Sequence, residues 1–168
     1  MDYDKLITKL RTGSPPAPEN LVLLEGFLNT CHGEMGFDDF ETVDSMQAWL
    51  RSVDLWTGPS DITSAQSEII IKFRSDLRTW ILGKERFRTL NELVATIPFQ
   101  AEFSSEGEVR LHSKGNVFDR VLGALIEVIL ESQQNGTWDR FKCCALSTCG
   151  WAFYDPTRSR TKRWCSMK

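Results

Sequence analysis

Three cysteines near the end of the chain have the spacing of metal ligands. Cys144 and Cys149 are separated by four residues, and Cys165 follows after a stretch that is first aromatic and then basic. Zinc binds thiolates tetrahedrally, and a short turn between two cysteines directs both sulfurs to one point. These residues therefore supply three of the four ligands of a structural zinc site. Either the fourth ligand lies beyond Lys168, or the site has lost its metal.

The residues between these cysteines predict the elements that would position them. Gly150 suits a knuckle, because glycine tolerates the positive φ at which the backbone folds back over the sulfurs. Trp151, Phe153 and Asp155 alternate with Ala152 and Tyr154, which predicts a half-buried strand. Pro156 and Thr157 turn the chain, and we expect residues 161–165 to return as the second strand of a hairpin. With a following helix, this would be a treble-clef-like finger.

The same residues carry a family resemblance. The run Cys-Ala-x3-Cys-Gly-Trp-x-Phe-Tyr-Asp-x-x-Arg-x-Arg-x-x-Arg-Trp-Cys-Ser-Met resembles the CGNR-type zinc finger over residues 140–168. In that family the run continues, two residues on, into Cys-Gly-Asn-Arg and a basic tail. The resemblance implies one zinc per chain, with ligands at Cys144, Cys149 and Cys165 and a fourth beyond Lys168.

Proteins of this family usually carry an N-terminal ABATE domain and are described as stress-induced transcription regulators of bacteria. An apolar run ending in Asn29-Thr30 is similar to one in that domain, and Phe73-Arg74 falls where the domain shows Leu-Arg. The resemblance implies an ABATE-like helical body over residues 1–136 and a finger over residues 137–168. Arg74 and Arg78 lie off the apolar stripe of their helix, so solvated charges are the simpler expectation. Arg74 is nevertheless the leading candidate for a ligand or anion site in the body.

Composition places the protein among soluble globular chains. Of 168 residues, 41% are hydrophobic and 26% charged, and no apolar run reaches membrane-spanning length. The start, Met-Asp-Tyr-Asp-Lys, does not resemble a secretory signal. We therefore expect a cytoplasmic protein with no membrane contact, in which clustered cysteines bind metal and do not form disulfides. Cys143, beside a ligand, is interpreted as a packed neighbour.

Charge is divided unevenly along the chain. Residues 138–168 carry seven Lys and Arg against two Asp and Glu, a net charge of +5, whereas the rest carries 13 against 21, a net charge of −8. A basic tip on an acidic body predicts that only the tip meets a polyanion. A merely solvated hairpin is the plainer alternative. On DNA, four side chains would contact phosphates or a base edge: Arg158, Arg160, Lys162 and Arg163.

Two other roles for the finger remain open. It could be a structural or protein-binding zinc module with no nucleic-acid role. RNA binding is a third possibility if Trp151, Tyr154 and Trp164 are exposed, because aromatic faces stack on unpaired bases.

Apolar periodicity predicts a mainly α (α+β) fold, a helical body with a small β-hairpin. In the longest helix, Ile69 is among the residues expected to face the core, and a polar loop is expected around Gly33 and Gly36. The finger follows the last helix without a flexible spacer, so we expect it to dock on the body. The predicted helices span 2–12, 21–30, 62–83, 90–97 and 117–134, with one more starting near 44, and the hairpin spans 99–111 with its turn at 104–107.

Enzymatic functions are not supported by the sequence. The two histidines, His32 and His112, are far apart and lack suggestive neighbours. Phosphate-binding glycine loops, His-Glu-x-x-His helices and Gly-x-Ser-x-Gly turns are absent from the sequence. We predict a regulator that contacts DNA through the finger, while its body senses a small molecule or binds a protein effector.

Overall fold

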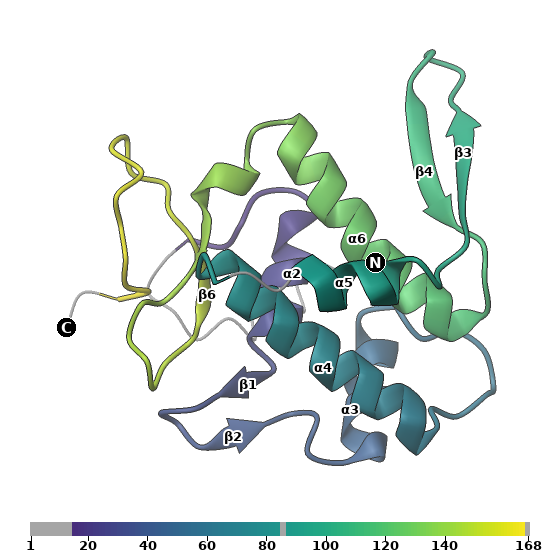
Figure 1. Ribbon diagram of the computed structural model, residues 1–168, viewed down its shortest axis with the longest axis horizontal. Helices are drawn as coiled ribbons and strands as arrows, with labels where there is room; N and C mark the ends of the chain where they lie inside the picture. Colours follow the sequence, from purple (N-terminus) through teal and green to yellow (C-terminus); the bar gives the residue numbers. More distant parts are fainter. Residues whose placement is uncertain (1–14, 85–86, 167–168) are drawn as a thin grey trace.

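The computed structural model describes residues 15–84 and 87–166, and within them the chain forms a mixed α+β fold (Figure 1). Five α-helices are accompanied there by three separate two-stranded antiparallel sheets and one 3-10 turn, η1 (Trp138–Arg140). This confirms the predicted fold class. The predicted helix at 2–12 lies outside the described residues. The helices are α2 (Leu21–Leu28), α3 (Val43–Ser52), α4 (Ser64–Ile81), α5 (Phe87–Val94) and α6 (Val117–Gln134), and the strands are β1 (Cys31–His32), β2 (Phe37–Asp38), β3 (Phe99–Phe103), β4 (Val109–Ser113), β5 (Phe141–Cys143) and β6 (Ala152–Tyr154).

Helix α2 lies at the centre of the core. Its sequence is apolar almost throughout, and Phe27 is fully buried. The Phe27 ring lies 6.0–6.3 Å, centroid to centroid, from the rings of Phe40, Trp49 and Phe73. Because α2 packs against α4, α6 and β6, the buried helix touches both the body and the C-terminal strand pair.

The two longest helices, α4 and α6, begin at capping boxes. Thr63 and Gln66 cap α4, and Asn116 and Asp119 cap α6, so that backbone N–H groups at each N-terminus are satisfied. Helix α6 has the bounds predicted from its apolar spacing. In α4 the prediction for Ile69 is wrong: its side chain is exposed, because the next residue, Ile70, takes the fully buried position.

Helix α5 and the region around Gly36 differ from expectation. Helix α5 begins three residues earlier than predicted and ends at Val94. The expected polar loop contains a short hairpin instead, in which β1 and β2 pair His32 with Phe37. Gly36, at φ +66°, provides the left-handed residue of its turn.

The predicted hairpin forms, with Phe103 paired to Val109, and projects beyond the helices at the end of the molecule opposite the finger (Figure 1). Its apolar face is largely uncovered, and Phe103 is 77% exposed.

The finger and the body share one hydrophobic core. Phe141, Cys143 and Ala152 belong to the same buried cluster as α2, α4 and α6. Trp138 stacks on Trp80 of α4 at 4.9 Å between ring centroids. The finger is therefore docked on the body, and the division after residue 136 stays a prediction. In the described ranges, the helices lack the combination of length and hydropathy that a membrane crossing requires.

Candidate metal centre and basic loop

The turn that carries Cys144 and Cys149 is closed by strands β5 and β6. Cys143 pairs with Ala152, and the Cys144 N–H donates to the Trp151 carbonyl at 2.8 Å. Gly150 has φ +64°, as the knuckle requires. The expected partner of residues 151–155 was the segment 161–165, and this prediction is wrong. Strand β5 takes that place because Phe141 and Cys143 are buried against the body, whereas most of segment 161–165 lies at the surface.

Three sulfurs converge beside this turn. The Sγ atoms of Cys144, Cys149 and Cys165 all lie within 4.8 Å of one another, and those of Cys149 and Cys165 are 3.7 Å apart. Two thiolates on one tetrahedral zinc ion are separated by about 3.8 Å. The predicted convergence of the three cysteines is thereby confirmed, and their spacing fits a zinc ion. All five cysteines are free thiols.

The three sulfurs differ in how readily they ionise, and burial raises the pKa of Cys165. Burial opposes ionisation of Cys144, but hydrogen bonds from the backbone of Cys165 and Leu146 outweigh burial and lower its pKa. Burial raises the pKa of Cys149 to about 12, and the neighbouring sulfurs add to this, although the Trp151 N–H acts against it. Three adjacent thiolates repel one another, so a bound cation is what would allow all three to ionise together.

Cys143 is not part of this cluster. It is buried in the shared core, and burial raises its pKa to about 12. Such a thiol is unreactive, which agrees with its interpretation as a packed neighbour.

A histidine of the body reaches the cysteine cluster, and the sequence did not reveal it. His32 of β1 is buried, and its Nε2 lies 3.6 Å from Cys149 Sγ. The two residues are 117 positions apart, so only the fold brings them together. The sequence signal was weak: a histidine within a predicted polar loop.

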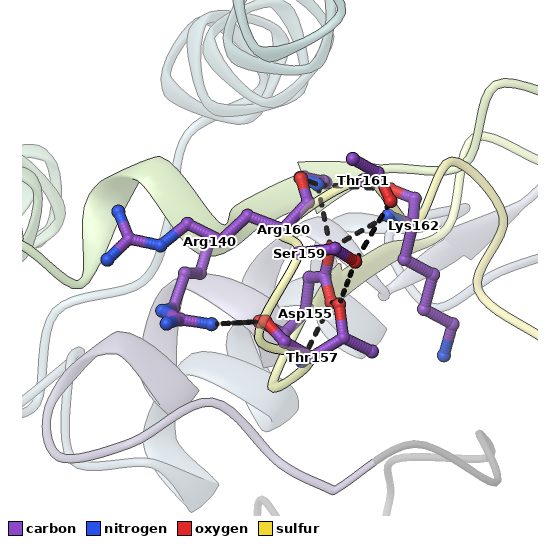
Figure 2. A network of polar contacts seen from close by, with 8 residues as sticks. Arg140, Asp155, Thr157, Ser159, Arg160, Thr161 and Lys162 are labelled. Carbon is purple, nitrogen blue, oxygen red and sulfur yellow. Dashed lines mark hydrogen bonds and ion pairs between the residues drawn. The ribbon is translucent and has the colours of Figure 1, made fainter.

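The segment after β6 is organised around Asp155. We name residues 156–163 the basic loop. Asp155 is fully buried, and its carboxylate accepts hydrogen bonds from the Thr157 hydroxyl and N–H and from the Lys162 N–H, at 2.6–3.0 Å (Figure 2). It also accepts from Lys142 Nζ at 2.8 Å. Burial opposes ionisation, but these donors hold the Asp155 pKa well below its usual range. The basic loop is therefore folded around one buried charge.

Two cations outside the loop also hold it in place. Arg140 donates to the carbonyls of Asp155 and Thr157, at 3.2 and 2.8 Å (Figure 2). Lys142 donates to the carbonyls of Arg160 and Lys162 in addition to its ion pair with Asp155. Arg140 and Lys142 thus satisfy main-chain carbonyls, and much of their charge is turned towards the protein.

The four predicted DNA contacts do not share one environment. Arg158, Arg160 and Arg163 are exposed. Lys162 is only half-exposed: its Nζ lies 5.3 Å from the centroid of the Phe153 ring and donates to the Cys165 carbonyl. Three of the four side chains are therefore available at the surface of the loop.

The aromatic residues considered for RNA stacking are mostly covered. Trp151 is 2% exposed and packs on His32 with ring centroids 4.9 Å apart. Tyr154 is half-buried. Of the three, Trp164 alone is exposed, at 54%, and the Arg163 guanidinium lies over its ring, 5.6 Å from the centroid. The condition set for RNA binding is not met at Trp151.

The expectation of solvated charges at Arg74 and Arg78 is wrong. Arg74 is 4% exposed and donates to both carboxylate oxygens of Asp38 and to the Thr30 hydroxyl. Burial opposes ionisation of Asp38, but Arg74 lowers its pKa. Arg78 donates to main-chain carbonyls of Leu28 and Cys31. Guanidinium groups can be buried where carboxylate and carbonyl oxygens accept their hydrogen bonds. The partner of Arg74 is therefore a carboxylate of the protein itself, at the position where an external anion had been considered.

Among known protein families, a match is found for the C-terminal part of the chain. Residues 140–168 match the family described as CGNR zinc finger. Comparison of the chain with curated proteins gives no significant match. The match covers the cysteine cluster and the basic loop. The likeness of the body to an ABATE domain stays a prediction.

Proposed function

We propose that the protein is a non-enzymatic transcription regulator of the bacterial cytoplasm, which contacts DNA through the basic loop and receives a stress-related signal through its helical body. The observation that carries the proposal is the exposure of Arg158, Arg160 and Arg163 on a loop fixed around a buried carboxylate. A rigid loop presents cations at defined positions without a large loss of side-chain and backbone entropy on binding. The match of the same segment to a zinc-finger family supports this.

Zinc would have a structural part in this proposal. Cys144, Cys149 and Cys165 would hold it, and the bound ion would neutralise their thiolates and fix the turn to the segment that follows the basic loop. The Ala145 N–H already donates to the Arg163 carbonyl at 2.9 Å, so the loop and the turn are neighbours. DNA affinity should accordingly depend on the cysteines as well as on the arginines.

A sensing role for the body is supported by a half-open apolar cavity. It has a volume of about 170 Å³ and lies between α4, α5 and α6, lined by Phe73, Leu77, Trp80, Leu90, Asn91, Val94, Ile126 and Ile129. Trp80 also stacks on Trp138, which packs on Phe141 at the start of β5. A molecule in the cavity would therefore touch a chain of aromatic contacts leading to the finger.

The alternative is a structural or protein-binding zinc module. Leu146 and Trp164 are 45% and 54% exposed beside the cysteine cluster. Exposed apolar side chains on a small module are typical of protein-interaction sites. On this alternative the arginines would contribute to a protein contact, and DNA would not bind.

A salt-dependent DNA titration separates the two functions. Labelled duplex is titrated with the zinc-loaded full chain and with an Arg158→Ala, Arg160→Ala, Arg163→Ala variant at two salt concentrations. If the arginines neutralise phosphates, the slope of log affinity against log salt falls by roughly 0.9 for each phosphate that is no longer neutralised. A matched triple variant in the acidic body, Arg88→Ala, Arg110→Ala, Arg120→Ala, should leave the slope unchanged. Equal, negligible binding by all three proteins in low salt would end the DNA proposal.

A further inference from the structure

His32 is placed to act on the metal centre without being one of its ligands. Its ring lies in the second position of β1, and its Nε2 lies 3.6 Å from Cys149 Sγ, within hydrogen-bonding distance for a sulfur acceptor. His32 is not among the residues whose ligand atoms all lie within 4.8 Å of one another. It therefore approaches one sulfur of the cluster and not its centre.

The hydrogen bonds of the ring assign its tautomer. The Met35 N–H donates to His32 Nδ1 at 3.0 Å, so Nδ1 provides a lone pair. In a neutral imidazole the other nitrogen then carries the hydrogen, and that nitrogen, Nε2, faces Cys149. A metal ligand would need its lone pair at Nε2. This arrangement instead makes His32 an N–H donor to the sulfur.

Two aromatic rings hold the imidazole in this orientation. Phe37 stacks on it at 5.9 Å and Trp151 packs on it at 4.9 Å, measured between ring centroids. Phe37 belongs to β2 and Trp151 follows the cysteine turn, so the body and the finger each supply one wall. Because the donor is held before any metal arrives, little ordering entropy would be lost when it meets a thiolate.

We propose that His32 is a positioning residue of the metal centre, an N–H donor to the Cys149 thiolate that couples zinc binding to the β1–β2 hairpin of the body. The inference rests on the proposed zinc site. A donor to a ligating sulfur disperses its negative charge and fixes its direction, and loss of such outer partners typically weakens metal binding.

Neighbouring contacts keep the segment around His32 fixed on both sides. The Asn29 side chain donates to the Ala152 carbonyl at 2.9 Å and accepts from the Ala152 N–H at 2.8 Å. A Cβ on Gly33 would lie 2.7 Å from the Thr148 carbonyl oxygen, so the hairpin touches the cysteine turn directly. On the other side, Arg74 and Arg78 of α4 hold residues 28–38 through the hydrogen bonds described above. The hairpin therefore connects α4 to the sulfurs.

Substitutions that separate the hydrogen bond from the packing test this role. His32→Phe keeps an aromatic ring between Phe37 and Trp151 but removes the donor, whereas His32→Gln offers an amide N–H. Zinc affinity of the full chain is measured by competition with a chelator. We expect His32→Phe to bind zinc roughly 10–100-fold more weakly, and His32→Gln to recover most of that loss. His112→Phe, in the exposed hairpin, is the matched control and should bind as the parent does.

Two spectroscopic readouts do not depend on affinity. Nitrogen NMR of the zinc-loaded protein should show His32 protonated at Nε2 and not at Nδ1. The Co²⁺-substituted protein should show the same ligand-field bands in the parent and in His32→Phe, because the ligands are unchanged. Unfolding of the metal-free variants shows whether a variant that binds weakly is folded.

Several results would overturn the inference. Equal zinc affinity of the parent and His32→Phe would leave His32 without a positioning role. An unprotonated Nε2, or altered Co²⁺ bands in His32→Phe, would make it a ligand. Failure of the parent itself to bind zinc would remove the proposed metal centre, and this is distinguishable because it precedes any comparison of variants.

Discussion

Lys142 Nζ lies 2.8 Å from the Oδ2 atom of Asp155, a side chain that is fully buried. The pair joins strand β5, before the cysteine turn, to the residue that directly precedes the basic loop. Removing one member of a buried, hydrogen-bonded ion pair leaves the other charge without compensation, so the pair is far more sensitive to a single substitution than a surface salt bridge. The position of the basic loop therefore depends on an ion pair formed by two residues that lie outside it, Lys142 and Asp155.

We predict that Asp155→Asn destabilises the protein by about 3 kcal/mol and loosens the basic loop. Urea unfolding measures the first effect. Limited trypsin digestion measures the second, because Arg158 and Arg160 become better substrates in a mobile loop. Asp139→Asn is the control, since Asp139 is exposed and lies 4.0 Å from Arg160. Similar digestion rates for Asp155→Asn and the parent would contradict the organising role of Asp155.

The same carboxylate predicts a loss of stability in acid. The Asp155 pKa is lowered in the folded protein, so its contribution is fully present above the unfolded value near 3.8 and is lost as the pH falls through the lower folded value. Unfolding measured between pH 5 and 2 should show a steeper decline for the parent than for Asp155→Asn. Parallel curves would mean that the carboxylate is not stabilised by folding.

The cysteines should differ in their effect on zinc. We predict that the parent binds zinc and that Cys144→Ser binds it far more weakly, because the variant removes one of the three converging sulfurs. Cys143→Ala changes the adjacent residue, which belongs to the shared core and not to the cluster. It should keep its zinc while losing some stability. Elemental analysis after gel filtration measures the metal; equal zinc contents in both variants would exclude the cluster as the site.

Local sequence patterns predicted the elements whose side chains interact over short separations. Helix α6 was predicted at its full length because its apolar residues recur at helical spacing from Val117 to Leu130 and Asn135-Gly136 is a typical helix end. The convergence of Cys144 and Cys149 follows from one turn. Cys165 joined them because the family pattern placed it there.

Long-range packing decided the features that the sequence did not reveal. The contact of His32 with Cys149 spans 117 positions, and no local pattern marks it. Strand β6 pairs with β5, which precedes it in the chain. The turn residues at Pro156 and Thr157 had suggested a partner that follows it, residues 161–165. A solvated side chain was the simpler expectation for Arg74, because charged residues are usually exposed. The structure buries its guanidinium group, which donates hydrogen bonds to Asp38 and Thr30.

The outer hairpin should contribute little to stability in spite of its apolar residues. Phe103 is 77% exposed, so Phe103→Ser should change the free energy of unfolding by less than about 0.5 kcal/mol. Phe73→Ala, in α4, removes a ring that is 1% exposed and should cost about 3–5 kcal/mol. Urea unfolding compares them. A large effect of Phe103→Ser would show that another surface covers the hairpin in solution.

Glu25 gives the protein a second pH dependence, of the opposite sign. Its side chain lies in α2, fully buried; one oxygen accepts from the Ala17 N–H at 2.7 Å, and the other finds no hydrogen-bond partner within the structure described. Burial raises the Glu25 pKa from 4.5 to about 7, although the Ala17 hydrogen bond acts against it. Folding therefore favours the neutral, protonated form of the Glu25 side chain.

Because the folded pKa is the higher one, Glu25 contributes its full stability below pH 4.5 and loses it as the pH rises through 7. The loss amounts to about 3 kcal/mol in alkaline solution. We predict that Glu25→Gln, which is neutral at every pH, removes this decline between pH 5 and 8 in urea unfolding. Exposed Glu68→Gln is the control and should keep the parent's slope. A decline in Glu25→Gln as steep as in the parent would show that another group is responsible, since the contribution of Asp155 changes only in acid.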